Sequence, residues 1–197
     1  MLTAPGGFVA VDVPADLCGT SRERARKGLE FADFTRYSFR RHGDYTTLAE
    51  ELKSIERYLL LEKARFGDRL DITLSIAPEV LPVAVPFLCI QPLVENAVRH
   101  GLERRSDDGA GHIRIIARDR GQECVIEVED DGAGEDPEKV RRALAGDTAV
   151  DSVGLGNVDA RLRTTYGDDY GLVVETAPGA GTKVTVRVPK FATGVSV

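Results

Sequence analysis

The sequence lacks the features that mark several common classes of protein. Its three cysteines, Cys18, Cys89 and Cys124, form no C-x-x-C pair. Such a set indicates neither a disulfide framework nor a zinc site, and it favours a reducing compartment. No apolar run approaches the ~20 residues of a membrane-spanning helix, and the first residues lack the basic region of a secretory signal. We therefore expect a soluble, cytoplasmic chain, or the cytoplasmic end of a longer membrane-anchored protein.

Missing motifs and the charge balance exclude further classes. The formal net charge of −6 argues against a dedicated nucleic-acid binder. The sequence has no G-x-x-x-x-G-K-[ST] loop, no full G-x-G-x-x-G, no H-E-x-x-H and no nucleophile-elbow sequence. P-loop ATPases, Rossmann enzymes, zincins and α/β-hydrolases are therefore disfavoured.

The first third of the chain predicts two amphipathic helices after an irregular leader. Residues 1–20 are rich in proline and glycine, and a charged helix over about 21–41 follows. Thr47 and Glu50 form the sequence of a capping box that opens a second helix ending near residue 66. We interpret residues 21–67 as a helical hairpin. We expect it to pair partly with a second copy through the apolar positions Leu48, Leu52, Ile55 and Leu59.

From Leu70 onward the hydrophobic period changes to that of strands alternating with helices. Strands are predicted at 70–76, 112–119, 124–130, 172–176 and 183–188, and helices at about 86–101, 136–145 and 154–166. This order implies an α+β fold, a two-layer sandwich with helices on one face of a mainly antiparallel sheet, over residues 68–190. Residues 191–197 are a tail.

The predicted helix at 86–101 carries polar groups that packing does not require. Glu95 and Asn96 are adjacent and project about 100° apart, and Arg99 lies on the same side at i+4 and i+3. An acid, an amide oxygen and a cation in this arrangement suit a metal-bound polyphosphate.

Two glycine-containing segments follow strands or open helices. Asp130-Asp131-Gly132-Ala133-Gly134 could let a base approach the backbone while an acid accepts its hydrogen bond. Gly154-Leu155 opens a helix whose free N–H groups could hold phosphates. Residues 135–153 between them have the polar composition of a lid. Taken alone, a polar turn explains the first segment equally well, and simple turn chemistry explains the second better.

The order of these segments resembles the Bergerat ATP-binding fold of gyrase, the large heat-shock chaperones, histidine kinases and MutL. Within that superfamily, residues 91–101 (QPLVENAVRHG) resemble the N box of LytS-type sensor histidine kinases. The likeness extends upstream through 34–38 and 48–67, and downstream through 157–162 and 166–167. It covers roughly residues 21–189 and implies the ATP-binding transmitter portion of such a kinase.

The resemblance implies a role for each matching position. Asn96 would supply its amide oxygen to Mg²⁺, Glu95 would be the general base or orienting carboxylate, and Asp130 would accept the adenine N6 hydrogen bond. Gly132 and Gly134 would let the base approach, and Gly154 and Leu155 would begin the phosphate-side helix. The remaining nucleotide contacts would be Arg99 and His100 near the phosphates and Thr182 closing the adenine pocket. A homodimer and a response regulator are the implied partners.

Two departures from the family pattern affect the expected activity. Ser152 stands where the second glycine box usually has glycine. The family's phosphate-accepting histidine lies in an H-F-[IL]-[FY]-N segment that would fall near Pro5, and the sequence has no such segment. The histidines present are His42, in a turn, His100, and His112, expected at the surface.

Three hypotheses therefore remain open. The chain is the catalytic portion of a histidine kinase whose acceptor histidine lies elsewhere, or a non-catalytic regulator that binds a partner kinase or response regulator when ATP is bound. A gyrase- or MutL-type ATPase is the third, and the LytS-like helices argue against it.

Overall fold

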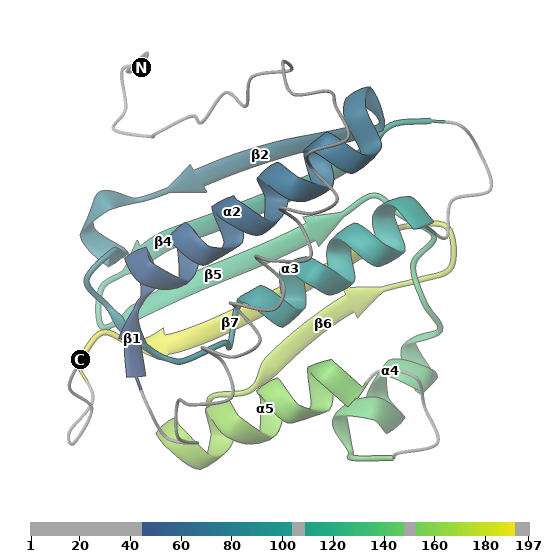
Figure 1. Cartoon of the computed structure of the whole chain (residues 1–197). Coiled ribbons are helices and arrows are strands. Elements are labelled where there is room, and N and C mark those ends of the chain that lie inside the picture. Colours follow the sequence, from purple (N-terminus) through teal and green to yellow (C-terminus); the bar gives the residue numbers. More distant parts are fainter. Residues whose placement is uncertain (1–44, 104–108, 148–152, 192–197) are drawn as a thin grey trace, which may run out of the picture.

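A single five-stranded sheet carries helices on one face (Figure 1). The computed structural model describes residues 45–103, 109–147 and 153–191. The strand order is β2 (Leu70–Ile76), β4 (Gly111–Arg120), β5 (Glu123–Asp130), β7 (Thr182–Pro189) and β6 (Leu172–Thr176). The covering helices are α2 (Leu48–Phe66), α3 (Gln91–Val98), α4 (Pro137–Leu144) and α5 (Val153–Tyr166). The predicted α+β two-layer sandwich is confirmed. The leader, the helix at 21–41, His42, Ser152 and residues 192–197 lie outside the described residues.

Helix α2 begins and ends where the sequence predicts. The Thr47 side chain accepts a hydrogen bond from the backbone N–H of Glu50, and Gly67, with φ 60°, forms the C-cap. The Glu50 carboxylate also accepts a hydrogen bond from the Thr46 hydroxyl. Leucine, glutamate and lysine fill most of the helix, and these residues lose little side-chain freedom in an α-helix.

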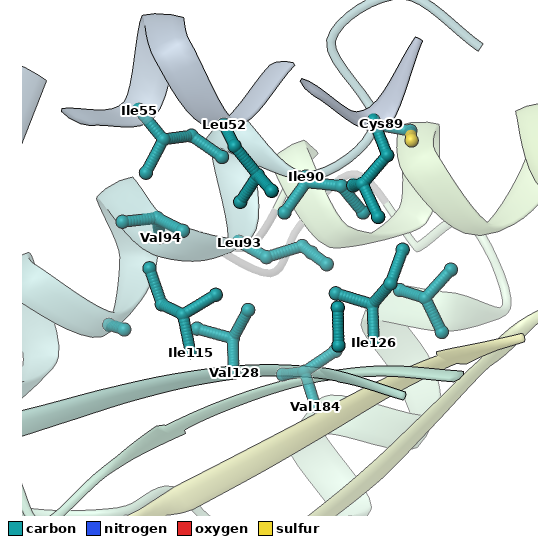
Figure 2. Packing of buried hydrophobic residues seen from close by; sticks show 14 of the residues in the cluster. Leu52, Ile55, Cys89, Ile90, Leu93, Val94, Ile115, Ile126, Val128 and Val184 are labelled. Carbon is teal, nitrogen blue, oxygen red and sulfur yellow. The ribbon is translucent and has the colours of Figure 1, made fainter. Parts of the chain in front are cut away.

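The apolar side of α2 is part of the domain core. Leu48, Leu52, Ile55 and Leu59 are each at most 8% exposed. Figure 2 shows Leu52 and Ile55 above Leu93 and Val94 of α3, with the sheet residues Ile115, Ile126, Val128 and Val184 below. The prediction that these α2 positions contribute to a dimer interface is wrong. Their apolar surface is already covered by the same chain, so none is left for a second copy.

The opposite face of the sheet is polar and charged. Arg118 and Lys183 both pair with Glu127, at 3.0 and 3.1 Å, and Arg114 pairs with Glu129 at 3.0 Å. These side chains alternate along their strands with buried residues, as in a sheet that faces water on one side. The face is accordingly a solvated surface.

The predicted helix at 86–101 is shorter than expected. Residues Ala84–Pro86 form strand β3, which pairs with β1 (Tyr45–Thr47). Helix α3 then begins at Gln91, with Pro92 in its first turn, where a missing N–H costs nothing. Beyond Val98 the chain continues as a π-helical segment, η3 (Arg99–Glu103). The two short strands have too few residues for a periodic signal, so sequence analysis missed them.

The sheet is antiparallel except for the pair β2–β4, which is parallel. The crossover between these two strands contains α3, and this places α3 on the sheet opposite β5 and β7 (Figure 1). Short 3-10 turns at Gly67–Arg69 and Pro78–Val80 flank β2. Within the described ranges, no helix combines the length and the apolar character needed to cross a bilayer.

Candidate functional site

A pocket opens between α3, the sheet and the segment that carries α4 and α5. Its empty space, including the mouth toward solvent, is ≈ 500 Å³. Of the predicted site residues, it is lined by Asn96 from α3, His100 from η3, Asp130 from β5, Leu155 from α5 and Thr182 from β7. Segments up to 86 residues apart in the sequence thus meet as predicted.

Asp130 ends β5 and places a carboxyl group at the pocket wall. Its Oδ1 accepts a hydrogen bond from the backbone N–H of Gly132 at 3.0 Å. Burial raises the pKa of the Asp130 carboxyl to about 6, and the neighbouring Asp131 raises it further, against the lowering effect of backbone N–H groups of Gly132 and Thr182. A partly desolvated acceptor of this kind suits a neutral N–H donor such as an exocyclic amine.

The two glycines after Asp130 are required by the packing of the backbone. Sequence analysis explained them instead by the approach of a bound base. A Cβ on Gly132 would lie 2.4 Å from the carbonyl oxygen of His100, and one on Gly134, which has φ +63°, would lie 2.0 Å from the carbonyl oxygen of Ala177. Both glycines therefore allow backbone segments to pack against each other. Gly132 joins the end of β5 to η3, and so fixes His100 relative to Asp130.

Asn96 and Arg99 contact each other on α3 and η3. Arg99 Nη2 donates a hydrogen bond to Asn96 Oδ1 at 3.0 Å, the i, i+3 contact that the sequence spacing allows. Among the residues that the structure describes, Arg99 Nε is buried and has no hydrogen-bond partner. Buried N–H groups are almost always satisfied in folded proteins, so this Nε is available to an acceptor from outside the described residues.

Gly154 and Glu95 differ in how they relate to Asn96 and the pocket. A Cβ on Gly154 would lie 3.7 Å from Asn96 Nδ2, so the start of α5 is adjacent to the amide. Glu95 is exposed, is not part of the pocket lining, and accepts a hydrogen bond from Gln91 Nε2 at 2.8 Å. The carboxylate is thus accessible from outside the pocket.

Sequence analysis missed the apolar walls of the pocket and one further acid. The alternation of strands could have identified Val128 and Val184, which lie two residues from Asp130 and Thr182 and so on the same face. Glu135 lines the pocket as well and pairs with Lys139 of α4 at 2.7 Å. The other missed lining residues are Leu93, Ala97, Val140 and Val174.

The donors present fit a magnesium ion only together with a ligand. Within the described residues, no three histidine, cysteine or acidic side chains gather at one point. Mg²⁺ is commonly held by one or two protein oxygens plus substrate phosphates rather than by a protein cage. Asn96 Oδ1 can provide such an oxygen, and the unsatisfied Arg99 Nε suits an anionic phosphate.

The family model described as histidine kinase-, DNA gyrase B- and HSP90-like ATPase matches residues 85–192, which contain all of these groups. The chain belongs to this family. A second model, described as histidine kinase, matches residues 15–70. Together the two matches place an ATPase domain after a histidine kinase region, the composition of the ATP-binding catalytic portion of a sensor kinase.

Curated relatives agree with this assignment. The chain is 36% identical over 168 residues to the sensor histidine kinase BtsS of Escherichia coli K12, covering 85% of this chain and 28% of the relative. It is 34% identical over 189 residues to the sensor protein LytS of Staphylococcus haemolyticus, covering 92% and 32%. The chain thus spans about a third or less of the length of these relatives.

Solved structures of similar fold are also histidine kinases. The catalytic domain of histidine kinase ThkA has a TM-score of 0.57 at 17% identity, covering 74% of this chain and 95% of that domain. Histidine kinase AdeS of Acinetobacter baumannii has a TM-score of 0.54 at 17% identity, covering 86% and 79%. At this identity the likeness establishes the fold.

Proposed function

We propose that the pocket binds ATP together with Mg²⁺ and that the chain transfers a phosphoryl group from ATP to a histidine. The observation that carries this proposal is the convergence of Asn96, Asp130 and Thr182, from three elements, on one apolar pocket beside the unsatisfied Arg99 Nε. Phosphoryl transfer needs mainly positioning and neutralisation of charge, and these groups can supply both.

The adenine ring occupies the deeper, apolar part of the pocket. Asp130 accepts the hydrogen bond of the exocyclic amine. Val128, Val184 and Leu155 provide flat apolar contact for the ring faces. Thr182 lies within hydrogen-bond distance of Thr176, 3.1 Å between their hydroxyl oxygens, which holds its side chain at the pocket edge.

The phosphates lie toward α3 and the start of α5. Asn96 would hold Mg²⁺ through its amide oxygen, and the ion would supply neutralisation of phosphate charge. Asn96 Oδ1 accepts a hydrogen bond from Arg99, so the guanidinium would have to turn toward the phosphates to free that oxygen, and Nε would gain an acceptor there. The backbone N–H groups near Gly154 face the same anion, because a helix N-terminus favours negative charge.

Glu95 serves the incoming nucleophile. Its exposure leaves the carboxylate accessible to a histidine that approaches from outside the pocket, and Gln91 orients it through their hydrogen bond. The carboxylate can accept the imidazole proton or hold the ring in the reactive tautomer. The exposed side chain of His112 is paired with that of Asp71 at 2.9 Å, which does not suit an acceptor. We place the acceptor histidine outside the folded domain that α2 and the sheet form together.

Dimerisation and transfer to a response regulator complete the proposal. The α2 core face is buried, so we place the contacts between two copies on the solvent side of α2. Light scattering at micromolar concentration measures the mass, and a monomer would contradict the dimer.

The test of the proposed function is incubation with γ-labelled ATP and a kinase fragment that carries an acceptor histidine but no ATP-binding domain. We expect label on that fragment, stable to base and labile to acid, and lost in Asn96→Asp. Glu79→Gln, an exposed position far along the chain from the motifs, is the control. ATP binding without label would favour a regulator, and steady phosphate release lost in Glu95→Gln would indicate an ATPase.

A further inference from the structure

A buried carboxylate on α2 caps a helix that begins about forty residues later. Glu51 is 2% exposed, and its two oxygens accept hydrogen bonds from the backbone N–H groups of Leu88, at 2.6 Å, and Ile90, at 3.3 Å. Leu88 and Ile90 lie in the segment that leads into α3, which begins at Gln91. The sequence gives no sign of this contact, because Glu51 lies among the charged residues of an amphipathic helix.

Helix α3 has no local cap of its own. Its N-cap residue, Ile90, has no side chain that could accept a hydrogen bond, so the segment that leads into the first turn takes its acceptor from α2. A carboxylate is well suited, because negative charge is favoured at a helix N-terminus. Leu88 has φ 60°, which lies in the left-handed region. This conformation is energetically unfavourable for leucine and persists only when neighbouring groups hold it.

A second helix holds the same segment from the other side. Arg161 of α5 donates a hydrogen bond from Nη1 to the carbonyl oxygen of Phe87. Burial raises the pKa of Glu51, and the positive charge of Arg161 offsets part of that rise. The segment Phe87–Ile90 is therefore fixed by one acid from α2 and one cation from α5, both distant from it in sequence.

We propose that Glu51 and Arg161 are positioning residues that fix the start of α3 so that Asn96 can hold nucleotide-bound Mg²⁺. This inference rests on the proposed function. Helix α3 spans only Gln91–Val98, so displacement of its first turn moves Asn96 as well. Asp130 lies at the end of β5 and is positioned by the sheet and by Gly132. Its contact with adenine therefore does not depend on the segment Phe87–Ile90.

The test separates positioning from general stabilisation by measuring ADP affinity with and without Mg²⁺. In Glu51→Gln, one oxygen still accepts, but the NH₂ group now faces a backbone N–H. We expect the increase in affinity that Mg²⁺ gives the native chain to fall by about tenfold or more, as for groups that orient metal ligands. Affinity without Mg²⁺ should change by less than about threefold, since Asp130 and the apolar walls remain. Glu56→Gln on the same helix is the matched control.

A second variant guards against loss of folding and tests the mechanism. Arg161→Gln leaves the Glu51 hydrogen bonds in place and should show the same loss in a milder form. Adding Leu88→Gly to Glu51→Gln should restore part of the Mg²⁺ effect, because glycine adopts φ 60° without strain. An undiminished Mg²⁺ effect, or a parallel loss with and without Mg²⁺ that tracks the melting temperature, overturns the inference.

Hydrogen exchange distinguishes this failure from failure of the proposed function. The amides of residues 88–94 should exchange faster in Glu51→Gln than in the native chain, with α5 and β5 unchanged, whether or not nucleotide is present. If the native chain binds no nucleotide, the proposed function fails and the Asn96 role fails with it. Unchanged exchange at 88–94 would instead show that Glu51 does not hold α3. That result would contradict the positioning role and leave the proposed function intact.

Discussion

Arg99 donates a hydrogen bond to the amide oxygen of Asn96 at 3.0 Å, so the atom proposed as metal ligand is paired with a cation in the ligand-free chain. The buried Nε of the same guanidinium has no partner among the described residues. An anion that attracts the Arg99 guanidinium would therefore break this hydrogen bond and leave the Asn96 oxygen open to a metal ion.

Replacing Arg99 should affect nucleotides according to their phosphates. In Arg99→Met we expect ATP to bind about 10- to 100-fold more weakly, the range for loss of a charge-assisted hydrogen bond of about 1.5–3 kcal/mol. Adenosine should bind as to the native chain. Calorimetric titration with both ligands checks this, with Arg57→Met on α2 as the control. An equal loss for adenosine would mean that Arg99 supports the pocket rather than the phosphates.

Nucleotide binding should weaken as the pH falls through about 6, the pKa to which burial raises the Asp130 carboxyl. Protonation removes the acceptor charge, so affinity for ADP should drop by up to about tenfold per pH unit below that value. Affinity measured from pH 5 to 8 checks this. Asp130→Asn should bind more weakly at pH 8 and show a flatter profile. A profile that keeps its slope in Asp130→Asn would assign the titration to another group.

The same pKa shift should reduce stability at neutral pH. The native carboxyl titrates at about 6 and the unfolded one near 3.8, so its contribution to stability is complete below 3.8 and is lost as the pH rises to 6. Asp130→Asn should therefore be more stable than the native chain at pH 8, by at most about 3 kcal/mol, with the difference shrinking toward pH 4. Urea unfolding at both pH values measures it.

Two glycines should respond to alanine in opposite ways. In Gly132→Ala the new Cβ would meet the His100 carbonyl oxygen at 2.4 Å, and we expect a loss of about 1–3 kcal/mol from the backbone shift this forces. In Gly154→Ala the nearest atom is at 3.7 Å and the position is helical, so a gain of about 0.5–1 kcal/mol is expected. Thermal unfolding of both variants checks the contrast, which equal melting temperatures would refute.

The apolar side of α2 should behave as core. Leu59→Ala should cost about 2–5 kcal/mol, because the side chain is 2% exposed and leaves a cavity. Leu60→Ala, next along the helix and 42% exposed, should change stability by less than about 0.5 kcal/mol. Neither variant should alter the mass measured by light scattering. A monomer produced by Leu59→Ala without loss of stability would restore the dimer-interface interpretation.

Local sequence was sufficient for the strands of the five-stranded sheet, most helices and the order of the motifs. Leu70, Ile72, Leu74 and Ile76 alternate and form β2, and Thr47 caps α2, because these signals depend on neighbours within a few residues. The candidates Asn96, Asp130, Leu155 and Thr182 were also identified, and all line the pocket. Their chemistry and order along the chain were informative without knowledge of their distances.

Only the tertiary structure decided which surfaces meet. The amphipathic pattern of α2 shows that one side needs cover, but it does not say whether α3 and the sheet or a second copy supplies it. The close approach of Gly132 to His100, the pairing of Arg99 with Asn96 and the cap that Glu51 gives α3 depend likewise on segments far apart in the chain. Periodicity, caps and turns depend on residues close together in the chain and could be predicted from the sequence. Contact between distant segments depends on their relative placement, which hydrophobic burial sets only when the whole chain folds.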